Sequence, residues 1–132
     1  MNYHYDDAGR AKSKRSKQTN DCVIRAISLT LKQPYDEVYD GFMALGRKCS
    51  RGTPKKVWQQ FLNSDKRFVR KPFPAVAGQP RMSLEKFAEI FDSGLYIVQM
   101  AGHLTTVING SVYDVFEPRK DGCVYAVWRL IE

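Results

Sequence analysis

The sequence predicts an α+β domain in which helices come first and an antiparallel sheet of about four strands follows. From Cys22 to Phe91, apolar residues recur mainly at the three- and four-residue spacing of amphipathic helices. After Gly94 the pattern changes to β-branched and aromatic runs that are separated by turn residues. Asn109-Gly110, between two of these runs, is the strongest short signal for a β-hairpin. Helices followed by such a meander of strands are typical of α+β domains.

The chain length of 132 residues fits a single domain, and the sequence shows no internal repeat. Residues 1–20 are polar, and basic side chains alternate there with serine and alanine. We therefore expect a basic polar arm over residues 1–20, either extended or mobile. The folded domain is expected to occupy residues 21–132.

The first helix is expected to begin at Cys22, with Asn20 or Asp21 as its cap. On a helical wheel, Arg25 and Lys32 lie on one narrow polar stripe, and apolar residues cover most of the remaining circumference. Such a wide apolar arc predicts a helix that is enclosed on several sides rather than one that lies on the surface.

Three further helices are predicted from the same spacing and from their end signals. One follows Pro34 and ends at Gly46, one has a Thr53 cap with Pro54 at its first helical position, and one runs from a Ser83 cap to Gly94. Residues 68–80 hold three prolines and are predicted to form a loop or an irregular extended segment.

Four strands are expected over residues 95–100, 103–108, 111–116 and 123–130. A two-residue turn at 109–110 sets Thr105 opposite Asp114. Because side chains alternate between the two faces of a strand, His103 and Thr105 share one face. Asp114 is then diagonal to His103 on that face, so the sequence predicts an imidazole beside a carboxylate.

The formal net charge of +7 is concentrated in one segment of the chain. Residues 47–71 hold nine basic side chains and one acidic side chain, whereas the rest of the chain is close to neutral. We therefore expect this segment to contact an acidic protein or a nucleic acid. Its aromatic residues Trp58, Phe61 and Phe68 are expected to face the core, and the alternative is that they stack on bases. The basic residues are Arg47, Lys48, Arg51, Lys55, Lys56, Lys66, Arg67, Arg70 and Lys71.

The composition argues against several other classes of protein. Cys22, Cys49, Cys123, His4 and His103 show none of the short spacings of zinc sites, so no structural metal is expected. No apolar run reaches the ~18 residues of a membrane span, and the N-terminus lacks the apolar core of a secretion signal. We expect a cytoplasmic protein with no membrane partner.

Cys22, His103 and Asp114 are the residue types of a nucleophile, a base and an orienting group. A helix N-terminus lowers the pKa of a thiol because its unpaired N–H groups favour the anion. A carboxylate on one ring nitrogen fixes the tautomer of an imidazole and favours the imidazolium. Gln18, four residues before the cysteine, is a candidate amide donor to an oxyanion, alongside the backbone N–H of Cys22.

Each of these residues also has a purely structural interpretation. Cys22 would be a small core residue of a packed helix, and His103 a strand-edge histidine with a satisfied hydrogen bond. Asp114 would be a solvated acid of the hairpin, and Gln18 a member of the polar arm. Their occurrence together, in this order along the chain, favours the catalytic interpretation.

Three segments resemble the papain-like cysteine peptidase superfamily, namely QTNDC at residues 18–22, GHLTTV at 102–107 and YDVFEP at 113–118. The order Gln, Cys, His, Asp, with helices before the sheet, is the order of that superfamily. The most similar members are the peptidases that cleave double-glycine bacteriocin leaders. The resemblance implies a papain-like fold around a central nucleophile helix, without a cofactor. It also implies Cys22 as nucleophile, His103 as base, Asp114 as orienting acid and Gln18 as oxyanion donor.

The chain departs from the leader peptidases at two positions. Val23 stands where those peptidases have glycine after the cysteine, and their Asp-Pro pair would align with Glu117 rather than with Asp114. Glu117 has the opposite strand parity to the histidine, so we assign the role to Asp114. The run CVIRAIS, which begins at the cysteine, is also similar to ovarian-tumour-type deubiquitinases, although their His-plus-aromatic ending is missing.

Two functions from different classes follow from these observations. The first is a small papain-like thiol hydrolase that cleaves a peptide, isopeptide or related amide bond of a peptide or protein substrate through a Cys-His-Asp triad. The second is a catalytically inactive papain-like scaffold that binds nucleic acid or an acidic protein through residues 47–71. The sequence favours the first.

Overall fold

The computed structural model describes residues 1–48 and 51–131. Within these ranges the chain forms four α-helices, one short 3₁₀ helix and one six-stranded sheet. The predicted α+β class is confirmed, but the sheet is larger than the expected four strands and is not wholly antiparallel. In chain order the elements are β1 (Asn2–Tyr5), the 3₁₀ helix η1 (Arg10–Lys12), α1 (Cys22–Leu31), α2 (Tyr35–Ala44), α3 (Lys55–Ser64), β2 (Phe68–Pro72), α4 (Leu84–Ile90), β3 (Leu95–Met100), β4 (His103–Ile108), β5 (Ser111–Asp114) and β6 (Ala126–Leu130).

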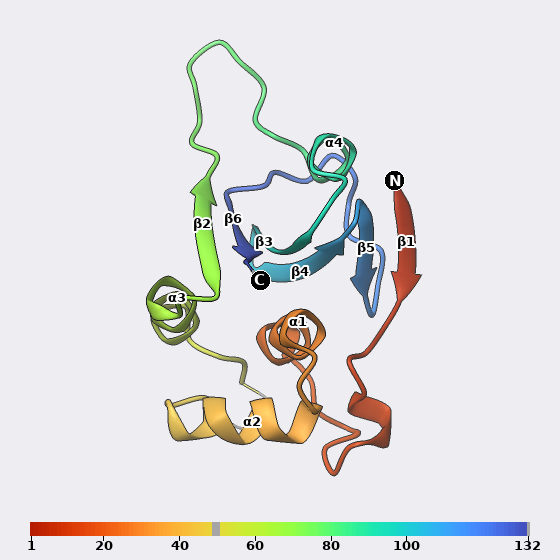
Figure 1. Ribbon diagram of the computed structural model, residues 1–132, viewed down its shortest axis with the longest axis vertical. Helices are drawn as coiled ribbons and strands as arrows, with labels where there is room; N and C mark the ends of the chain where they lie inside the picture. The colour runs from red at the N-terminus through yellow and green to blue at the C-terminus, as the bar shows by residue number, and fades with distance from the viewer. Residues whose placement is uncertain (49–50, 132) are drawn as a thin grey trace.

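The sheet has the strand order β1-β5-β4-β3-β6-β2, with β1 and β2 at its two edges (Figure 1). The β1–β5 pair is parallel, and all other neighbouring strands are antiparallel. His103 is the first residue of β4 and Asp114 is the last residue of β5. Because these strands are antiparallel neighbours, both residues lie at the same end of the sheet.

The hairpin between β4 and β5 forms as predicted. Thr106 pairs with Tyr113, and Ile108 pairs with Ser111. Asn109 and Gly110 have φ angles of 49° and 80°, the left-handed values that a two-residue type I′ turn requires.

Strand β1 lies within residues 1–20, for which an extended or mobile arm was expected, and it joins that segment to the sheet. Residues 2–5 pair in register with residues 111–114 of β5, and the backbone N–H of Asp6 continues the contact to the Asp114 carbonyl. Further along the arm, Arg10 forms an ion pair with Asp21 at 2.9 Å. Tyr3 and Tyr5 alternate with polar residues in this strand, but the run is only four residues long and nothing local indicates a partner strand at the other end of the chain.

Strand β2 corrects the second expectation, because residues 68–72 are not a loop. They pair with β6, and only Phe68 of the five residues is buried. Pro72 is the last residue of this edge strand, a position that proline tolerates because the sheet needs no N–H there. The prolines of residues 68–80 therefore led to the prediction of a loop where the first five residues form an edge strand.

Helices cover both faces of the sheet (Figure 1). Helices α1 and α3 lie against one face with α2 outside them, and α4 lies against the other face. Side chains on the central strands alternate between two buried clusters: Ile97 and Trp128 face the three-helix side, whereas Val98 and Val127 face α4. The fold therefore has a hydrophobic core on each side of the sheet.

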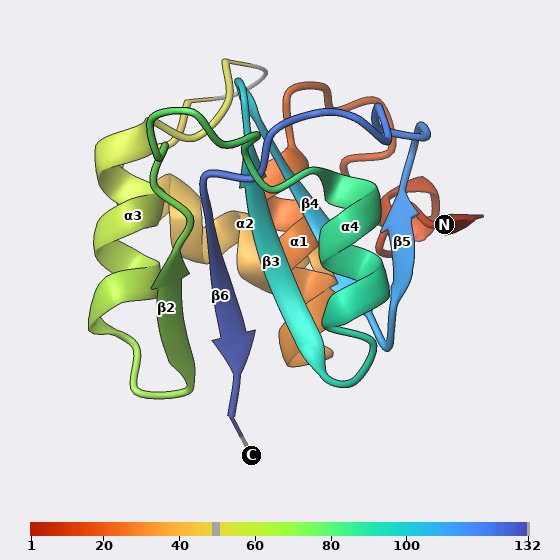
Figure 2. The same cartoon turned by 90° about the horizontal axis from the view of Figure 1, so that it is seen from above.

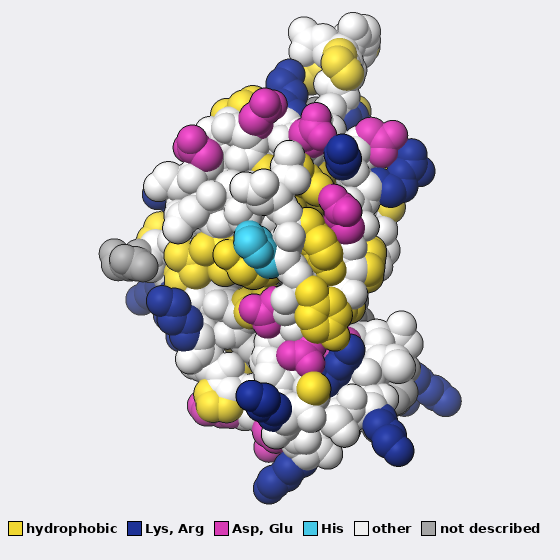
Figure 3. Space-filling view, turned by 90° about the vertical axis from the view of Figure 1, so that its right-hand side faces the viewer, with side chains coloured by type: hydrophobic (Ala, Val, Ile, Leu, Met, Phe, Trp, Pro, Cys, Tyr) yellow, Lys and Arg dark blue, Asp and Glu magenta, His cyan; other side chains and the backbone are white. Residues whose placement is uncertain are grey.

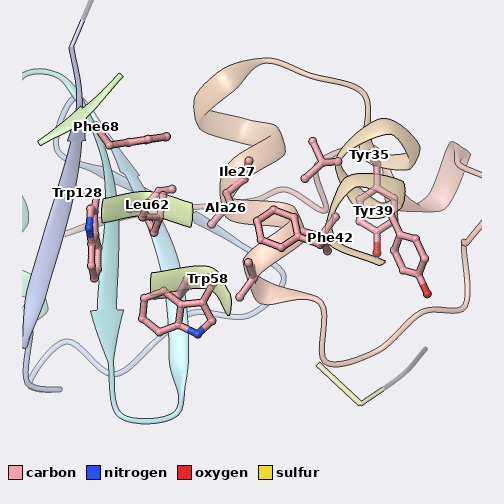
Figure 4. Close-up of a cluster of buried hydrophobic side chains, with 14 of the residues drawn as sticks. Ala26, Ile27, Tyr35, Tyr39, Phe42, Trp58, Leu62, Phe68 and Trp128 are labelled. Carbon is pink, nitrogen blue, oxygen red and sulfur yellow. The ribbon is translucent and has the colours of Figure 1, made fainter. Parts of the chain in front are cut away.

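Figure 4 shows how the larger core joins helices to sheet. Trp58 and Leu62 of α3 lie near Trp128 and Phe68 of the sheet, and the two indole rings meet edge to face with centroids 5.6 Å apart. The indole N–H of Trp128 donates to the side chain of Asn63 at 2.9 Å, so this buried ring has a polar partner.

Helix α1 is enclosed, as the apolar arc predicted. Even its polar residues Arg25, Ser28 and Thr30 are buried. Its N-cap position is occupied by Asp21, but the Asp21 side chain makes no capping hydrogen bond. The N-terminal N–H groups beside Cys22 therefore lack a side-chain cap.

Of the end signals predicted for the other helices, the Ser83 cap is confirmed, whereas the positions of Pro54 and Gly94 differ from the prediction. At α4, the Ser83 hydroxyl accepts from the backbone N–H of Lys86, as expected. At α3, Pro54 takes the N-cap position instead of the first helical position, and it makes no side-chain cap. Helix α4 ends at Ile90, four residues before the expected Gly94.

Candidate active site

The start of α1, the turn between β3 and β4, and the loop before α3 lie at the same end of the molecule (Figure 2). A cleft of about 880 Å³ opens at this end. Both Cys22 and His103 line it, although 80 residues separate them in the sequence. The tertiary fold therefore brings the candidate nucleophile and the candidate base into one open site.

Cys22 is the first residue of α1 and is half-buried. Burial of the thiol by itself raises its pKa, but hydrogen bonds from His103 and from the backbone N–H of Leu104 act in the opposite direction. The positive charges of His103 and Arg25 reinforce these hydrogen bonds. The net result is a Cys22 pKa below its ordinary value, which favours the thiolate.

His103 connects Cys22 to Asp114. Its Nε2 lies 2.7 Å from Oδ2 of Asp114, and its ring centroid lies 4.9 Å from that of Phe116. Burial of the imidazole disfavours the imidazolium, but the hydrogen bonds to Asp114 and Cys22 outweigh that effect and raise the pKa of His103 to about 9. The imidazolium is therefore the favoured form of His103 at neutral pH.

Asp114 is fully buried, and both of its oxygens have partners. Oδ2 accepts from the Thr105 hydroxyl at 2.6 Å and contacts His103, while Oδ1 accepts from Arg25 at 2.6 Å and from the backbone N–H of Val115 at 2.7 Å. Burial by itself raises the pKa of this carboxyl, but these partners outweigh burial and hold the pKa below its usual value. Asp114 is thus held as a carboxylate in a fixed orientation.

A second buried carboxylate extends this network toward the N-terminal segment. Asp21 accepts from Arg25 at 3.1 Å, from Arg10 at 2.9 Å and from the Tyr35 hydroxyl at 2.7 Å. Its charge is therefore neutralised by two guanidinium groups, although it precedes Cys22 in the sequence. This arrangement removes the repulsion that an unpaired Asp21 would exert on a Cys22 thiolate.

The two acids that were considered as the partner of His103 lie in different environments. Asp114 contacts His103, whereas Glu117 is exposed. The two amide side chains that precede Cys22 in the sequence also differ: Asn20 lines the cleft, and Gln18 is not among the cleft-lining residues. The backbone N–H of Gln18 donates to the Arg15 carbonyl, within a turn of the N-terminal segment.

Part of the basic segment 47–71 reaches the same cleft. Arg51, Lys55 and Arg70 line it. The sequence did not indicate this, because these residues are far from both Cys22 and His103 along the chain. Four other predicted partner-binding residues are exposed outside the cleft lining: Lys48, Lys56, Lys66 and Lys71. Arg67 is exposed but paired with Asp65 at 2.7 Å.

Arg47 does not fit the prediction of a partner-binding surface, because only 2% of it is exposed. Its guanidinium donates to the backbone carbonyls of Lys48 and Thr19, at 3.0 and 3.3 Å. It also stacks on the Tyr39 ring, 4.8 Å from the ring centroid. Arg47 therefore holds the segment that precedes Cys22 instead of contacting a partner.

The aromatic residues of the basic segment face the core, in agreement with the expected interpretation. Trp58 and Phe68 are buried, and Phe61 packs edge to face on Phe42 at 5.0 Å. Cys123 is half-buried, and Cys49 lies outside the described residues.

Within residues 1–48 and 51–131, no group of three or more His, Cys, Asp or Glu side chains is arranged to hold a metal ion. None of the described helices has the length and apolar character needed to cross a bilayer. A comparison of the chain with protein-family models, with curated proteins and with solved structures finds no match.

Three residues of the site were missed by the sequence reasoning. The sequence places Arg25 on a polar stripe of α1 and places Thr105 opposite Asp114, and neither observation identifies a residue of the site. A buried arginine inside an otherwise apolar arc is itself a signal, because such a charge needs a carboxylate partner. The sequence signal for Asn20 is weaker. Asparagine adopts left-handed φ angles more often than most residues, and the φ of Asn20 is 54°.

Proposed function

We propose that this protein is a small papain-like thiol hydrolase that cleaves a peptide, isopeptide or related amide bond with Cys22 as the nucleophile. The observation that carries the proposal is the hydrogen-bonded series from Cys22 through His103 to Asp114, which opens on a cleft. A nucleophile, a base and an orienting group in mutual contact are the signature of covalent amide hydrolysis.

In the first step the Cys22 thiolate attacks the carbonyl carbon, and the π electrons of the carbonyl move to its oxygen. The tetrahedral oxyanion then collapses, the C–N bond breaks, and the His103 imidazolium gives its proton to the departing nitrogen. The products of this half-reaction are a free amine and a thioester on Cys22.

In the second step the neutral His103 takes a proton from water, and the hydroxide oxygen attacks the thioester carbon. The C–S bond breaks, and the carboxylic acid leaves the site. The thiolate and the imidazolium are thereby restored. Asp114 keeps the imidazole ring oriented through both steps.

The oxyanion needs hydrogen-bond donors that are in place before the reaction. The backbone N–H of Cys22, at the uncapped start of α1, is one candidate. The side-chain amide of Asn20 is the second, because it lines the cleft; Gln18, which the family resemblance implies for this role, is not among the lining residues.

Alkylation of the thiols at pH 6 tests this proposal. Iodoacetamide reacts with thiolates, so a thiol with an ordinary pKa is slow at pH 6. We expect stoichiometric modification of Cys22, and a rate at least about tenfold lower in the His103→Ala variant because the imidazolium stabilises the thiolate. Mass spectrometry of proteolytic peptides measures the rate at each cysteine.

Cys123 provides a control in the same sample. It is half-buried, as Cys22 is, but it does not line the cleft that Cys22 shares with His103, and we expect it to react more slowly. If Cys22 reacted no faster than Cys123, and His103→Ala left its rate unchanged, the thiol hydrolase proposal would be wrong.

The second candidate is a catalytically inactive scaffold that binds an acidic partner. The exposed cations of the cleft favour it, because Arg51, Lys55 and Arg70 need no catalytic cysteine to attract an anion. It differs from the first candidate in leaving Cys22 unreactive, so the alkylation experiment separates the two.

A further inference from the structure

The arginine and lysine side chains that line the cleft of the candidate active site have no carboxylate counterpart in that lining. Four of its lining residues are basic, namely Arg25, Arg51, Lys55 and Arg70, and none is acidic. Arg25 is buried and already paired with two carboxylates. The other three are exposed, and none of them forms an ion pair within residues 1–48 and 51–131. Unpaired cations along a cleft attract an anionic ligand.

The start of α3 adds to this positive potential. Its first turn contains Lys55 and Lys56 and no acidic residue, and its N-cap Pro54 makes no side-chain cap. Cations are unfavourable at the positive end of a helix, so this arrangement reduces the stability of the free helix. An anion bound in the cleft would interact favourably both with these lysines and with the positive end of the helix.

A buried hydroxyl also lies at this position. Thr53, directly before α3, lines the cleft, and its Oγ1 is buried without a hydrogen-bond partner among the described residues. Buried hydroxyl groups are normally paired, since an unpaired one costs free energy. Thr53 therefore marks a locally unfavourable part of the cleft wall, as the cations at the start of α3 do, although its hydroxyl is itself shielded from a ligand.

The aromatic residues of the cleft favour a polypeptide over a nucleic acid. Trp58 is only 7% exposed and packs against Trp128, so its face cannot stack on a base. Phe116 is 51% exposed but packs against the His103 ring, and the half-buried Tyr125 ring carries the Arg81 guanidinium 4.8 Å from its centroid. The molecular face on the β1 side shows acidic as well as basic side chains (Figure 3), so the positive charge does not extend around the molecule as a broad track for a phosphate backbone.

We propose that the cleft binds a polypeptide segment with acidic side chains close to the amide bond that Cys22 attacks. The inference rests on the proposed function for the cleavage itself, but the binding of the segment is tested separately. Aspartate and glutamate side chains of the segment would contact Lys55 of α3, Arg70 of β2 and Arg51, which precedes α3.

Binding is measured on the Cys22→Ala variant of the full chain, which keeps the cations of the cleft but cannot cleave. The probes are a fluorescein-labelled peptide rich in Asp and Glu, and the peptide of equal length with Asn and Gln in their place. We expect the acidic peptide to bind, the amide peptide to bind far more weakly, and the affinity to fall as salt rises. Fluorescence anisotropy gives both dissociation constants.

Lys55 and Lys56 form a matched pair of controls, because they are consecutive exposed residues of one helical turn and only Lys55 lines the cleft. In the Cys22→Ala background, we expect Lys55→Glu to weaken binding of the acidic peptide about five- to tenfold. Lys56→Glu, which changes the net charge by the same amount, should leave the affinity nearly unchanged.

Three results would overturn the inference. The amide peptide could bind as tightly as the acidic one, or Lys56→Glu could weaken binding as much as Lys55→Glu. A single-stranded oligonucleotide could also bind more tightly than the acidic peptide and displace it, which would identify a nucleic-acid site. Slow alkylation of Cys22 in the wild-type protein would remove the hydrolase proposal alone, and the cleft would remain a binding site for acidic polypeptide.

Discussion

Asp114 is the residue at which the candidate site and the buried ion network meet. One of its oxygens contacts His103 and Thr105, and the other accepts from Arg25. A carboxylate removed from water costs several kcal/mol unless it is paired and hydrogen-bonded. Here each partner that offsets this cost also fixes the orientation of the carboxylate toward His103. Stability and the positioning of the imidazole therefore depend on the same side chain.

The buried ion network predicts a large effect for Arg25→Met. The change leaves Asp114 and Asp21 without their shared guanidinium, and uncompensated buried charge costs about 3–5 kcal/mol. Urea unfolding followed by tryptophan fluorescence measures the loss in the free energy of unfolding. Arg119→Met is the control, since Arg119 and Asp121 form an exposed pair and no measurable change is expected. Equal effects of the two changes would contradict the importance assigned to the network.

The coupling of Cys22, His103 and Asp114 predicts a two-step pH profile for alkylation of Cys22. The rate rises first at a pH below the ordinary thiol pKa, as the thiolate–imidazolium pair forms. It rises again near pH 9, when His103 loses its proton and no longer holds the thiolate in a hydrogen bond. In Asp114→Asn, the second step should move to lower pH because the carboxylate no longer stabilises the imidazolium.

Iodoacetamide rates from pH 4 to pH 10 give these profiles, and circular dichroism establishes that Asp114→Asn is folded. A folded Asp114→Asn protein with an unshifted second step would show that Asp114 does not control the protonation of His103.

At the scale of secondary structure elements, the site depends on two local features. Helix α1 presents Cys22 at an end without a side-chain cap, because Asp21 turns away to Arg10 and Arg25. The β4–β5 hairpin sets the register that brings Asp114 to His103. A register slip of one residue would move Asp114 to the opposite face of the sheet.

Two glycines therefore predict opposite effects on stability. Gly110, in the hairpin turn, has φ +80°, and an added Cβ would lie 3.1 Å from the Ala88 carbonyl oxygen. We expect Gly110→Ala to destabilise the protein by about 1–2 kcal/mol. Gly41 lies within α2 with open space around it, and Gly41→Ala should stabilise by about 0.5–1 kcal/mol because alanine loses less backbone entropy. Thermal unfolding of both variants checks the signs, and a stabilising Gly110→Ala would contradict the turn assignment.

At the scale of the whole molecule, the buried ion pairs and the exposed cations lie outside the two hydrophobic cores. The two cores fill the space on either side of the sheet, and the buried ions lie between α1 and the β4–β5 end of the sheet. The exposed cations of segment 47–71 divide between the cleft and the rest of the surface. The charged side chains thus form two groups, a buried ion network and a set of exposed cations, and Arg25 belongs to the first although it also lines the cleft.

The buried ions predict how stability varies with pH. Asp21 and Asp114 have pKa values below the reference value of 3.8, so their stabilisation is complete above pH 3.8 and is lost as the pH falls through the folded-state pKa values. The pKa of His103 is raised from 6.5 to about 9, so its stabilisation is complete below pH 6.5 and is lost as the pH rises toward 9. These three groups together stabilise the fold most between pH 3.8 and pH 6.5. Above that range the lowered pKa of Cys22 acts in the opposite direction and offsets part of the decrease that His103 causes.

The urea midpoint measured across the pH range checks this expectation. In His103→Ala the alkaline decrease should become smaller, whereas the acidic decrease should persist. An alkaline decrease of unchanged size would assign it to other groups.

Local sequence signals determined the α+β class, the four helices, the hairpin and the pairing of His103 with Asp114. Each of these depends on spacing over a few residues: the 3.6-residue helical period, the alternation of a strand, or the two-residue turn at Asn109-Gly110. The register of one hairpin was enough to select Asp114 over Glu117. These features could be predicted because the interactions that produce them are close in the sequence.

Only the tertiary structure decided the edge strands, the partners of Arg25, and the meeting of Cys22 with His103. It also decided that Arg51, Lys55 and Arg70 reach the cleft, whereas Arg47 is buried. These outcomes depend on contacts between segments that are far apart in the chain, and neither periodicity nor composition encodes which distant segments meet. Packing of both cores fixes where α1, α3 and the sheet ends come together, and that placement sets which charged side chains surround Cys22.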